Sequence, residues 1–339
     1  MQGVIQIWTT NCCNLHCFNC TQLGNLSGKP KFITPEQFET AVLSVKGYWG
    51  VVGIFGSNPA THPQFPLLCD ILRRHIPYTQ RGLWCNDPIK PENGRAMRQT
   101  FNPAHSNLNV HMVDAAAKRF KEWWPESHVV GLYNDSRHSP PYVAMRDVLR
   151  KPCPACTAAA TGGTSSFTDM GSCPQCDGTG QVYDEELAWG LIANCDINRH
   201  WSAMIGVFRG EVRAWFCEIA GAQAMLHQTD PRYPDTGVPL EHPAYKAAME
   251  AGERPWWDWT MDRFAQQVRI HCHSCGVPLR GHGELATAGP EGKEQVSAVH
   301  REVYRPKVRG RTVELVTTPT QLGTTLPRMT DYLGNATRS

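Results

Sequence analysis

The sequence lacks three features that would place the protein in familiar classes. No apolar run approaches the roughly 18 residues needed to cross a membrane, so we expect no membrane span. The formal net charge is only +2, so no global field indicates a nucleic-acid or membrane-surface partner. The opening residues MQGVIQIWTT do not have the basic and then apolar layout of a secretory signal, and they predict a strand instead. We therefore expect a cytoplasmic protein, in the host cytoplasm if the chain is viral.

Cysteine, in contrast, is abundant, with 14 residues in a chain of 339. In a reducing compartment these side chains stay thiols, and many of them fall in pairs separated by two residues. That spacing is typical of metal ligands rather than disulfides. With 41% hydrophobic and 19% charged residues, the composition is that of a globular protein. The length suffices for one large α/β domain with an appendage or for two ordinary domains. The sequence thus predicts a metalloprotein.

The first cysteine group follows a predicted strand, the β-branched run VIQIW. Cys13, Cys17 and Cys20 have the spacing C-x3-C-x2-C within TTNCCNLHCFNC. A structural zinc site would need a fourth ligand, either Cys12 or a distant residue, because such sites usually have four closed ligands. Three thiolates on one short loop suit a cubane iron–sulfur cluster better, with one iron left for a ligand that is not protein. An open coordination position is typical of a catalytic metal site.

This stretch resembles the radical S-adenosylmethionine (radical SAM) superfamily. The resemblance implies that Cys13, Cys17 and Cys20 hold a [4Fe-4S] cluster, whose fourth iron chelates the amino and carboxylate groups of SAM. It also implies that an electron donor reduces the cluster, that SAM is cleaved, and that a 5′-deoxyadenosyl radical removes a hydrogen from the substrate. One departure is Asn19, because the family usually has an aromatic residue before the last cysteine, and here Phe18 is one place earlier.

A second segment carries the same resemblance. After the apolar run VVGIF, a glycine-containing turn occupies the place of the family's Gly-Gly-Glu-Pro signature: Gly56, Ser57, Asn58 and Pro59. His62 and Pro63 match a later His-Pro pair. Such a turn at the carboxyl end of a strand offers backbone groups to a small zwitterion. Because Ser57 and Asn58 replace Gly and Glu, the hold on the amino group of SAM is altered. The alternative is an ordinary turn between a strand and a helix.

Strands and helices alternate over the first 135 residues. We expect strands at 4–8, 51–55, 81–87, 107–114 and 127–135, and helices at 35–46 (with Thr34 as the cap), 65–75 and 115–124. This alternation predicts an α/β fold with a parallel sheet. The resemblance implies a partial (β/α)6 TIM-type barrel over residues 1–150, with the chemistry at the carboxyl ends of the strands. Asn86 and Asp114 end two predicted strands and are candidates for SAM contacts, and capping or turn roles are the alternative.

Residues 151–183 contain a second cysteine pattern, two C-x2-C pairs with sixteen residues between them: Cys153, Cys156, Cys173 and Cys176. The spacing matches a zinc ribbon. CPQCDGTGQV also resembles one repeat of the zinc domain of J-domain chaperones, which implies metal geometry and not chaperone activity. We predict a zinc-ribbon-like insert that binds zinc, with an auxiliary iron–sulfur cluster as the alternative. About 30 residues cannot bury a core of their own, so the metal would hold the insert together.

Residues 184–280 contain a looser set: Cys195, Cys217, Cys272 and Cys275. The first two flank a predicted hairpin that turns at Arg209 and Gly210, and the last two follow a predicted helix. This layout resembles the twitch or SPASM auxiliary-cluster regions of radical SAM enzymes and predicts a second iron–sulfur cluster. The match is imperfect because the SPASM glycine lies five residues before a cysteine, whereas Gly210 is seven before Cys217. Buried thiols or zinc are the alternatives, and two histidines could substitute as ligands: His271 and His273. No role is assigned to Cys12, Cys69 or Cys85.

Three functions are compatible with the sequence. The first is an enzyme that modifies a base in DNA, because the chain resembles phage radical SAM isomerases of thymidine hypermodification. That resemblance implies rearrangement of a glycine adduct on thymidine from N-linked to C-linked. Paired tryptophans at 123–124 and 256–257 could stack on a base, with the core as their alternative place. A basic stretch in the C-terminal extension 281–339 could contact phosphates or be a solvated loop: Arg305, Lys307, Arg309 and Arg311.

The second function is a twitch- or SPASM-type maturase of a peptide or small molecule. The third is a non-catalytic zinc protein in which every cysteine pair is structural. The second signature at 56–63 argues against this third alternative, because a structural zinc protein has no need of it.

Overall fold

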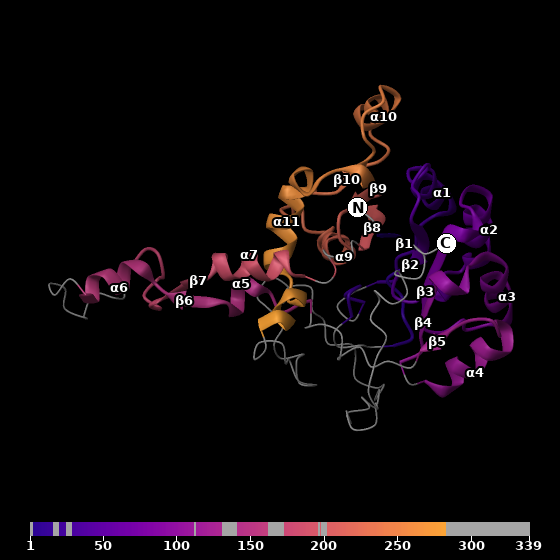
Figure 1. The fold of residues 1–339 in the computed structure, drawn as a ribbon, viewed down its shortest axis with the longest axis horizontal. Coiled ribbons are helices and arrows are strands. Elements are labelled where there is room, and N and C mark those ends of the chain that lie inside the picture. The colour runs from indigo at the N-terminus through magenta and orange to yellow at the C-terminus, as the bar shows by residue number, and fades with distance from the viewer. Residues whose placement is uncertain are drawn as a thin grey trace, which may run out of the picture.

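The computed structural model describes residues 3–15, 20–24, 29–111, 113–130, 141–161, 173–195, 197 and 202–282. An eight-stranded sheet runs through the molecule in the order β10-β9-β8-β1-β2-β3-β4-β5 (Figure 1). Its strands are β1 (Val4–Trp8), β2 (Val51–Phe55), β3 (Arg81–Cys85), β4 (Asn107–Asn109), β5 (Val129–Val130), β8 (Ser202–Phe208), β9 (Glu211–Trp215) and β10 (Val238–Pro239). Among the described helices, none has the length and apolar character that crossing a membrane requires.

Strands β1 to β5 are parallel and lie side by side in chain order. The connections carry α1 (Pro35–Leu43), α2 (Phe65–His75), α3 (Pro91–Thr100) and α4 (Asp114–Trp123), with short 3-10 turns η1 (Pro59–Thr61), η2 (Tyr78–Gln80) and η3 (Pro103–His105). On the other side of β1, β8 pairs with it in parallel and forms an antiparallel hairpin with β9. The prediction of an α/β fold with a largely parallel sheet is confirmed.

The central strands are buried along their whole length, as their apolar sequences predict. Every residue of β1 and β2 is buried, which explains why VIQIW and VVGIF show little polar alternation. Helix α1 begins at the predicted cap, where the Thr34 hydroxyl accepts from the Gln37 backbone N–H at 3.2 Å. The Gln37 side chain accepts in turn from the Thr34 N–H at 3.1 Å, which completes a capping box.

Some predicted element ends are wrong, and one helix was not predicted. The expected strand 107–114 ends at Asn109, because the backbone of His111 has a φ of 48° and cannot continue a strand. Helix α3 was not expected, because Asn93 and Gly94 lie in its interior and are poor helix formers. At Gly94 a Cβ atom would lie 2.5 Å from the Cβ of Trp123 on α4, so glycine allows the two helices to pack closely.

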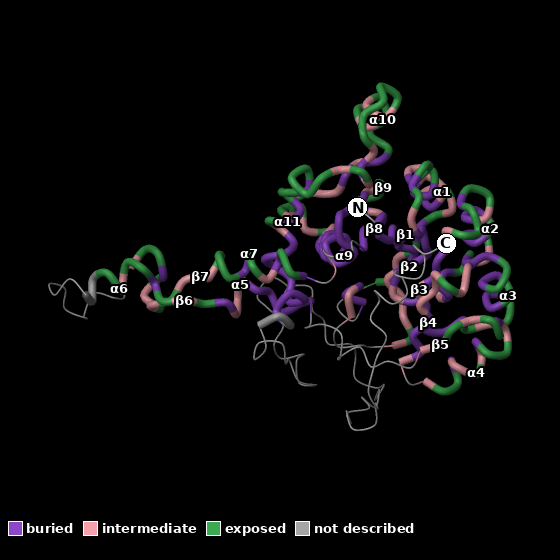
Figure 2. Tube along the Cα trace, in the orientation of Figure 1, coloured by how far each residue is buried: buried purple, intermediate pink, exposed green. Residues whose placement is uncertain are grey.

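The described residues 145–161 and 173–193 form an arm that extends away from the sheet (Figure 1). It contains α5 (Met145–Val148), β6 (Arg150–Pro152), α6 (Pro154–Thr161), β7 (Gln181–Tyr183) and α7 (Glu185–Ala193), with β6 and β7 paired antiparallel. Most described positions around β6 and β7 are exposed or half-buried (Figure 2), whereas Cys153 and Cys176 are buried. A segment with so little buried apolar surface needs another source of stability.

The remaining described chain packs beside β8 and β9 except for α10 (Pro243–Glu250), which projects away from the sheet (Figure 1). It forms α9 (Glu218–His227), α10 (Pro243–Glu250) and α11 (Ala265–His271), with 3-10 turns η6 (Trp256–Asp258), η7 (Met261–Phe264), η8 (Cys272–Ser274) and η9 (Val277–His282). The hairpin turns at Arg209 and Gly210 as predicted, both with positive φ. Trp124 and Trp256 are fully buried, so they belong to the core and the stacking role is wrong for these two.

Candidate functional site

The two loops singled out by the sequence lie against each other at the carboxyl ends of β1 and β2. The backbone N–H of Ser57 donates to the Thr10 carbonyl at 3.0 Å, and that of Asn58 donates to the Cys12 carbonyl at 2.8 Å. Adjacent parallel strands place their carboxyl ends at one edge of a sheet, so the cysteine loop and the 56–59 turn form one surface.

Close approach of these loops depends on Gly56. Its φ is +132°, and a Cβ atom there would lie 2.7 Å from the Thr10 carbonyl oxygen. Only glycine tolerates this conformation and this distance. The next residues have local structural roles, since Asn58 caps η1 by accepting from the Ala60 N–H at 3.3 Å and Pro59 is the first residue of that turn.

His62 is buried beneath this turn. Its Nε2 lies 2.8 Å from the Ile33 carbonyl, and its Nδ1 accepts from the Gln64 N–H at 3.0 Å, so the neutral Nε2-protonated ring satisfies both contacts. Burial lowers the pKa of His62, although the bond to Ile33 acts in the opposite direction. The histidine of the second signature is therefore a structural residue that ties the turn to the segment before α1.

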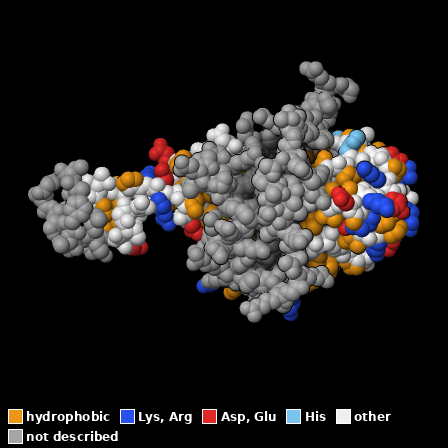
Figure 3. Space-filling view, turned by 90° about the horizontal axis from the view of Figure 1, so that it is seen from below, with side chains coloured by type: hydrophobic (Ala, Val, Ile, Leu, Met, Phe, Trp, Pro, Cys, Tyr) orange, Lys and Arg blue, Asp and Glu red, His pale blue; other side chains and the backbone are white. Residues whose placement is uncertain are grey.

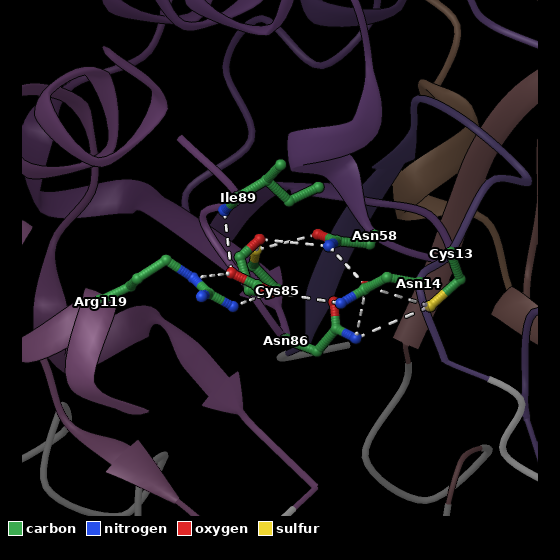
Figure 4. A network of polar contacts seen from close by, with 8 residues as sticks. Cys13, Asn14, Asn58, Cys85, Asn86, Ile89 and Arg119 are labelled. Carbon is green, nitrogen blue, oxygen red and sulfur yellow. Dashed lines mark hydrogen bonds and ion pairs between the residues drawn. The ribbon is translucent and has the colours of Figure 1, made fainter. Parts of the chain in front are cut away.

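Three asparagine amides meet where β1, β2 and β3 end (Figure 4). The Asn14 Oδ1 accepts from the Nδ2 of Asn58 at 3.0 Å and from the Nδ2 of Asn86 at 3.1 Å. The Asn86 Nδ2 also lies 3.7 Å from the sulfur of Cys13. The structure thus brings Cys13, Asn58 and Asn86 together, which were predicted on three separate segments.

Three other members of this network were not predicted as site residues: Cys85, Asp87 and Arg119. The Cys85 thiol donates to Asn58 Oδ1 at 3.1 Å, and burial raises the pKa of this thiol, so it stays protonated. Asp87 pairs with Arg119 from α4, with Nε to Oδ1 at 2.8 Å and Nη2 to Oδ2 at 2.5 Å. The position of Asp87 directly after Asn86 could have indicated it as a site residue. Nothing in the sequence around Arg119 connects that residue to a site.

Two buried polar atoms at this edge have no hydrogen-bond partner among the described residues: Ser57 Oγ and Asn86 Oδ1. A buried polar group normally has a partner, so orphaned atoms at the end of parallel strands indicate a ligand position. Asp114, in contrast, is exposed as the first residue of α4, and no hydrogen bond between described residues joins it to this network.

The cysteine loop is described in part. Cys13 and Cys20 are half-buried, and the Leu15 backbone N–H lies 3.3 Å from the Cys13 sulfur. Cys17 lies outside the described residues, so a shared metal of the three thiols stays a prediction. N–H groups directed at the Cys13 sulfur fit a thiolate ligand, because such donors stabilise negative charge on sulfur.

The four arm cysteines converge as expected. Their sulfur atoms all lie within 4.8 Å of one another, with Cys153 to Cys173 at 3.9 Å and Cys156 to Cys176 at 3.6 Å. A tetrahedral ion with bonds of about 2.3 Å separates its sulfurs by about 3.8 Å, so these distances fit one metal. The pKa of Cys173 is lowered to about 7, mainly because the backbone N–H of Gln175 donates a hydrogen bond to its sulfur. This group could therefore hold a metal ion.

The auxiliary cysteines are buried at the ends of helices: Cys195, Cys217, Cys272 and Cys275. Burial raises the pKa of Cys217 and of Cys275, and the charge of Cys195 raises both further. Among the described residues, the arm group alone has three or more such ligand atoms within 4.8 Å, so these four do not have the spacing of a single zinc ion. The thiolates of a cubane cluster bind different irons and lie farther apart.

The two neighbouring histidines already have protein partners. His271 is buried, with Nε2 2.8 Å from the Thr236 hydroxyl, and burial lowers the pKa of His271 to about 3. His273 Nδ1 lies 2.5 Å from the Tyr183 hydroxyl. Their contacts favour structural roles over metal ligation.

No protein-family model matches this sequence, and no curated protein matches it either. Among solved structures, the chain is similar to BtrN, whose crystal structure was determined in complex with AdoMet and 2-DOIA. The two share 11% sequence identity over 85% of this chain and 92% of that chain, with a TM-score of 0.42. At that identity and TM-score, the similarity does not identify the function of this protein.

Proposed function

We propose that the protein is a radical SAM enzyme. The observation that carries this proposal is the direct contact between the C-x3-C-x2-C loop after β1 and the 56–59 turn after β2, with unpaired buried polar atoms beside them. In this proposal, strands β1 to β5 are part of a partial (β/α)6 barrel of residues 1–150. When bound, a reduced cluster supplies one electron that cleaves SAM and generates a 5′-deoxyadenosyl radical.

The residues of this chain have distinct tasks in that proposal. The thiolates of Cys13, Cys17 and Cys20 hold a [4Fe-4S] cluster. SAM contacts fall to the turn, to the end of β3 and to the start of α4: Gly56, Ser57, Asn58, Pro59, Asn86 and Asp114. The donor set fits the cluster, since N–H groups of Leu15 and Asn86 are directed at the Cys13 sulfur. It also fits SAM, because Ser57 Oγ and Asn86 Oδ1 are buried without a partner among the described residues and suit a polar ligand.

The decisive experiment is anaerobic reconstitution with iron and sulfide, followed by incubation with SAM and a reductant. We expect an iron–sulfur chromophore and 5′-deoxyadenosine, detected by mass spectrometry. A variant with alanine at positions 13, 17 and 20 is the control and should make none. Reconstituted wild-type protein that contains the cluster but never cleaves SAM would contradict the proposal, as would full cleavage by the triple variant.

We further propose zinc at the arm cysteines, in a ribbon-like insert of residues 151–183. Sulfur separations of 3.6 and 3.9 Å support a single tetrahedral ion there. For residues 184–280 we propose a second iron–sulfur cluster at Cys195, Cys217, Cys272 and Cys275. Their burial and wider spacing favour a cluster over one zinc ion. Metal analysis that finds zinc alone, with no iron or sulfide, would instead support the non-catalytic zinc protein.

As the specific reaction we propose isomerisation of a glycine adduct on thymidine in DNA, from the N-linked to the C-linked form. A base in a duplex must leave the stack to reach the radical, so the enzyme would need phosphate contacts that hold the strand. The candidates Arg305, Lys307, Arg309 and Arg311 lie outside the described residues. Among the described side chains visible in Figure 3, basic and acidic ones are interspersed, so these side chains form no uniformly positive patch.

The test of this reaction uses a DNA oligomer that contains the glycine-bearing thymidine. We expect a rearranged nucleoside of unchanged mass, together with DNA affinity that falls as salt rises. The buried auxiliary cysteines favour a second candidate, a maturase of a peptide or small molecule. That candidate takes precedence if only a peptide or small molecule stimulates 5′-deoxyadenosine formation while the modified DNA stays inert.

A further inference from the structure

Asp87 is the centre of the polar network at the strand ends. Its carboxylate accepts from the Ile89 N–H at 2.9 Å, from the Asn14 Nδ2 at 3.3 Å, and from two nitrogens of Arg119. The Asp87 side chain is only 6% exposed, and that of Arg119 is 31% exposed. A carboxylate that pairs with a guanidinium can only accept hydrogen bonds, because it has no hydrogen to donate.

This acceptor decides which way the Asn14 amide faces. An amide can place either its oxygen or its nitrogen toward a neighbour, and only the nitrogen can donate to a carboxylate. Because the Asn14 Nδ2 faces Asp87, its Oδ1 faces the other amides and accepts from both Asn58 and Asn86. Both lone pairs of that oxygen are then used.

The orientation of Asn58 agrees with that of Asn14 and is also set by two backbone groups, the Asp87 carbonyl and the Ala60 N–H. One of its two Nδ2 hydrogens goes to Asn14 Oδ1 and the other to the Asp87 carbonyl at 3.1 Å. Its Oδ1 is left to accept from the Cys85 thiol and from the Ala60 N–H. Every donor and acceptor of the Asn58 side chain is satisfied in this arrangement and would be mismatched in the reverse one.

The chain of amides ends at Asn86. One Nδ2 hydrogen is used on Asn14, so the other faces the Cys13 sulfur at 3.7 Å, and Oδ1 is buried with no partner among the described residues (Figure 4). The Asn86 amide therefore has a fixed orientation, with its second N–H toward the Cys13 sulfur and its Oδ1 toward the ligand position.

We propose that Asp87, held by Arg119, is a positioning residue that orients Asn86 to donate to the Cys13 sulfur and to accept from an N–H group of SAM. This inference rests on the proposed function. A donor to a cluster thiolate stabilises the more negative, reduced cluster and raises its midpoint potential. A buried acceptor without a partner favours a ligand with an N–H donor, and the amino group of SAM supplies such N–H groups.

The test compares Asp87→Asn, Asn86→Leu, Arg119→Lys and Arg119→Met in anaerobically reconstituted protein. Midpoint potentials come from redox titration followed by electron paramagnetic resonance, and SAM affinity comes from equilibrium binding. For N86L we expect a more negative potential and SAM affinity reduced about tenfold or more, because donor and acceptor are both lost. D87N should also lower the midpoint potential and the SAM affinity, because an amide at position 87 allows the side-chain amide of Asn14 to flip. R119K should lie nearer to the wild type than R119M, because lysine keeps the charge.

The surface pair on α2 offers a matched control. Asp70 pairs with Arg73 at an exposed position, so Asp70→Asn removes a similar charge outside the site and should change neither potential nor affinity. If D87N loads a cluster and has the midpoint potential and SAM affinity of the wild type, the role proposed for Asp87 is wrong, irrespective of the result for N86L. If D87N does not load a cluster, the inference is tested by N86L alone. A midpoint potential and a SAM affinity equal to those of the wild type in N86L would then overturn it. Wild-type protein that assembles no cluster would instead refute the proposed function itself.

Discussion

The backbone N–H of Asn58 donates a hydrogen bond of 2.8 Å to the carbonyl oxygen of Cys12. With the neighbouring bond from Ser57 to Thr10, it joins the loop after β1 to the turn after β2. Any metal held by the cysteine loop is therefore fixed relative to the turn by backbone groups, which substitutions that preserve the backbone conformation leave in place.

The first prediction separates the two adjacent cysteines of that loop. Cys13→Ala should lose 5′-deoxyadenosine formation by at least about 100-fold, because a cluster deprived of one of three thiolates has no stable site. Cys12→Ala is the neighbouring control and should retain cleavage, since the Cys12 thiol makes a long contact of 3.8 Å with Asn11 Oδ1 and is not one of the three spaced cysteines. Mass spectrometry of the nucleoside product measures both. The reverse pattern would show that Cys12 is the ligand.

The second prediction concerns the arm. Wild-type protein should contain one zinc at the arm, and Cys156→Ser or Cys173→Ser should lose it, because three thiolates bind the ion much more weakly. Metal content by mass spectrometry is the measurement. Cys69→Ala is the control, since Cys69 is buried on α2 outside the arm. Retention of zinc in both serine variants would place the metal elsewhere.

The third prediction compares two helical glycines. Gly94→Ala should destabilise the fold by about 1–3 kcal/mol, because the new Cβ would lie 2.5 Å from the Cβ of Trp123 and force α3 away from α4. Gly190→Ala on α7 should stabilise by up to about 1 kcal/mol, since nothing lies within 4 Å and alanine is the better helix former. Urea unfolding measures both free energies. Equal effects of the two substitutions would contradict the packing of α3 on α4.

The fourth prediction concerns pH. The pKa of His62 is lowered by burial in the folded state, so the unfolded chain binds a proton first as pH falls. The contribution of His62 to stability is fully present above the unfolded pKa of about 6.5. This contribution is lost as pH falls from about 6.5 through the pKa of His62 in the folded state. The free energy of unfolding then decreases by at most about 1.4 kcal/mol per pH unit. Urea unfolding between pH 8 and pH 5 should show this loss. His62→Gln should have a shallower slope, and an unchanged slope would assign the pH dependence to other groups.

The sequence by itself determined the features that depend on neighbours in the chain. The cysteine spacings, the capping box at Thr34, the hairpin turn at Arg209 and the buried apolar strands are set by residues within a few positions of one another. Local chemistry suffices there, because a cap or a turn is satisfied by groups that the backbone already holds close together. The convergence of the four arm cysteines was also predictable, since two matched pairs on a short segment can meet.

Only the tertiary structure decided how the site is assembled. Asn14, Asn58, Asp87 and Arg119 are separated by tens of residues, and the register of parallel strands and the packing of α4 bring them within hydrogen-bond distance. Helix α3 forms despite its Asn-Gly pair because Gly94 lets it pack against Trp123. Such contacts leave no local signal, because the free energy that selects them comes from burial and pairing between segments distant in the chain.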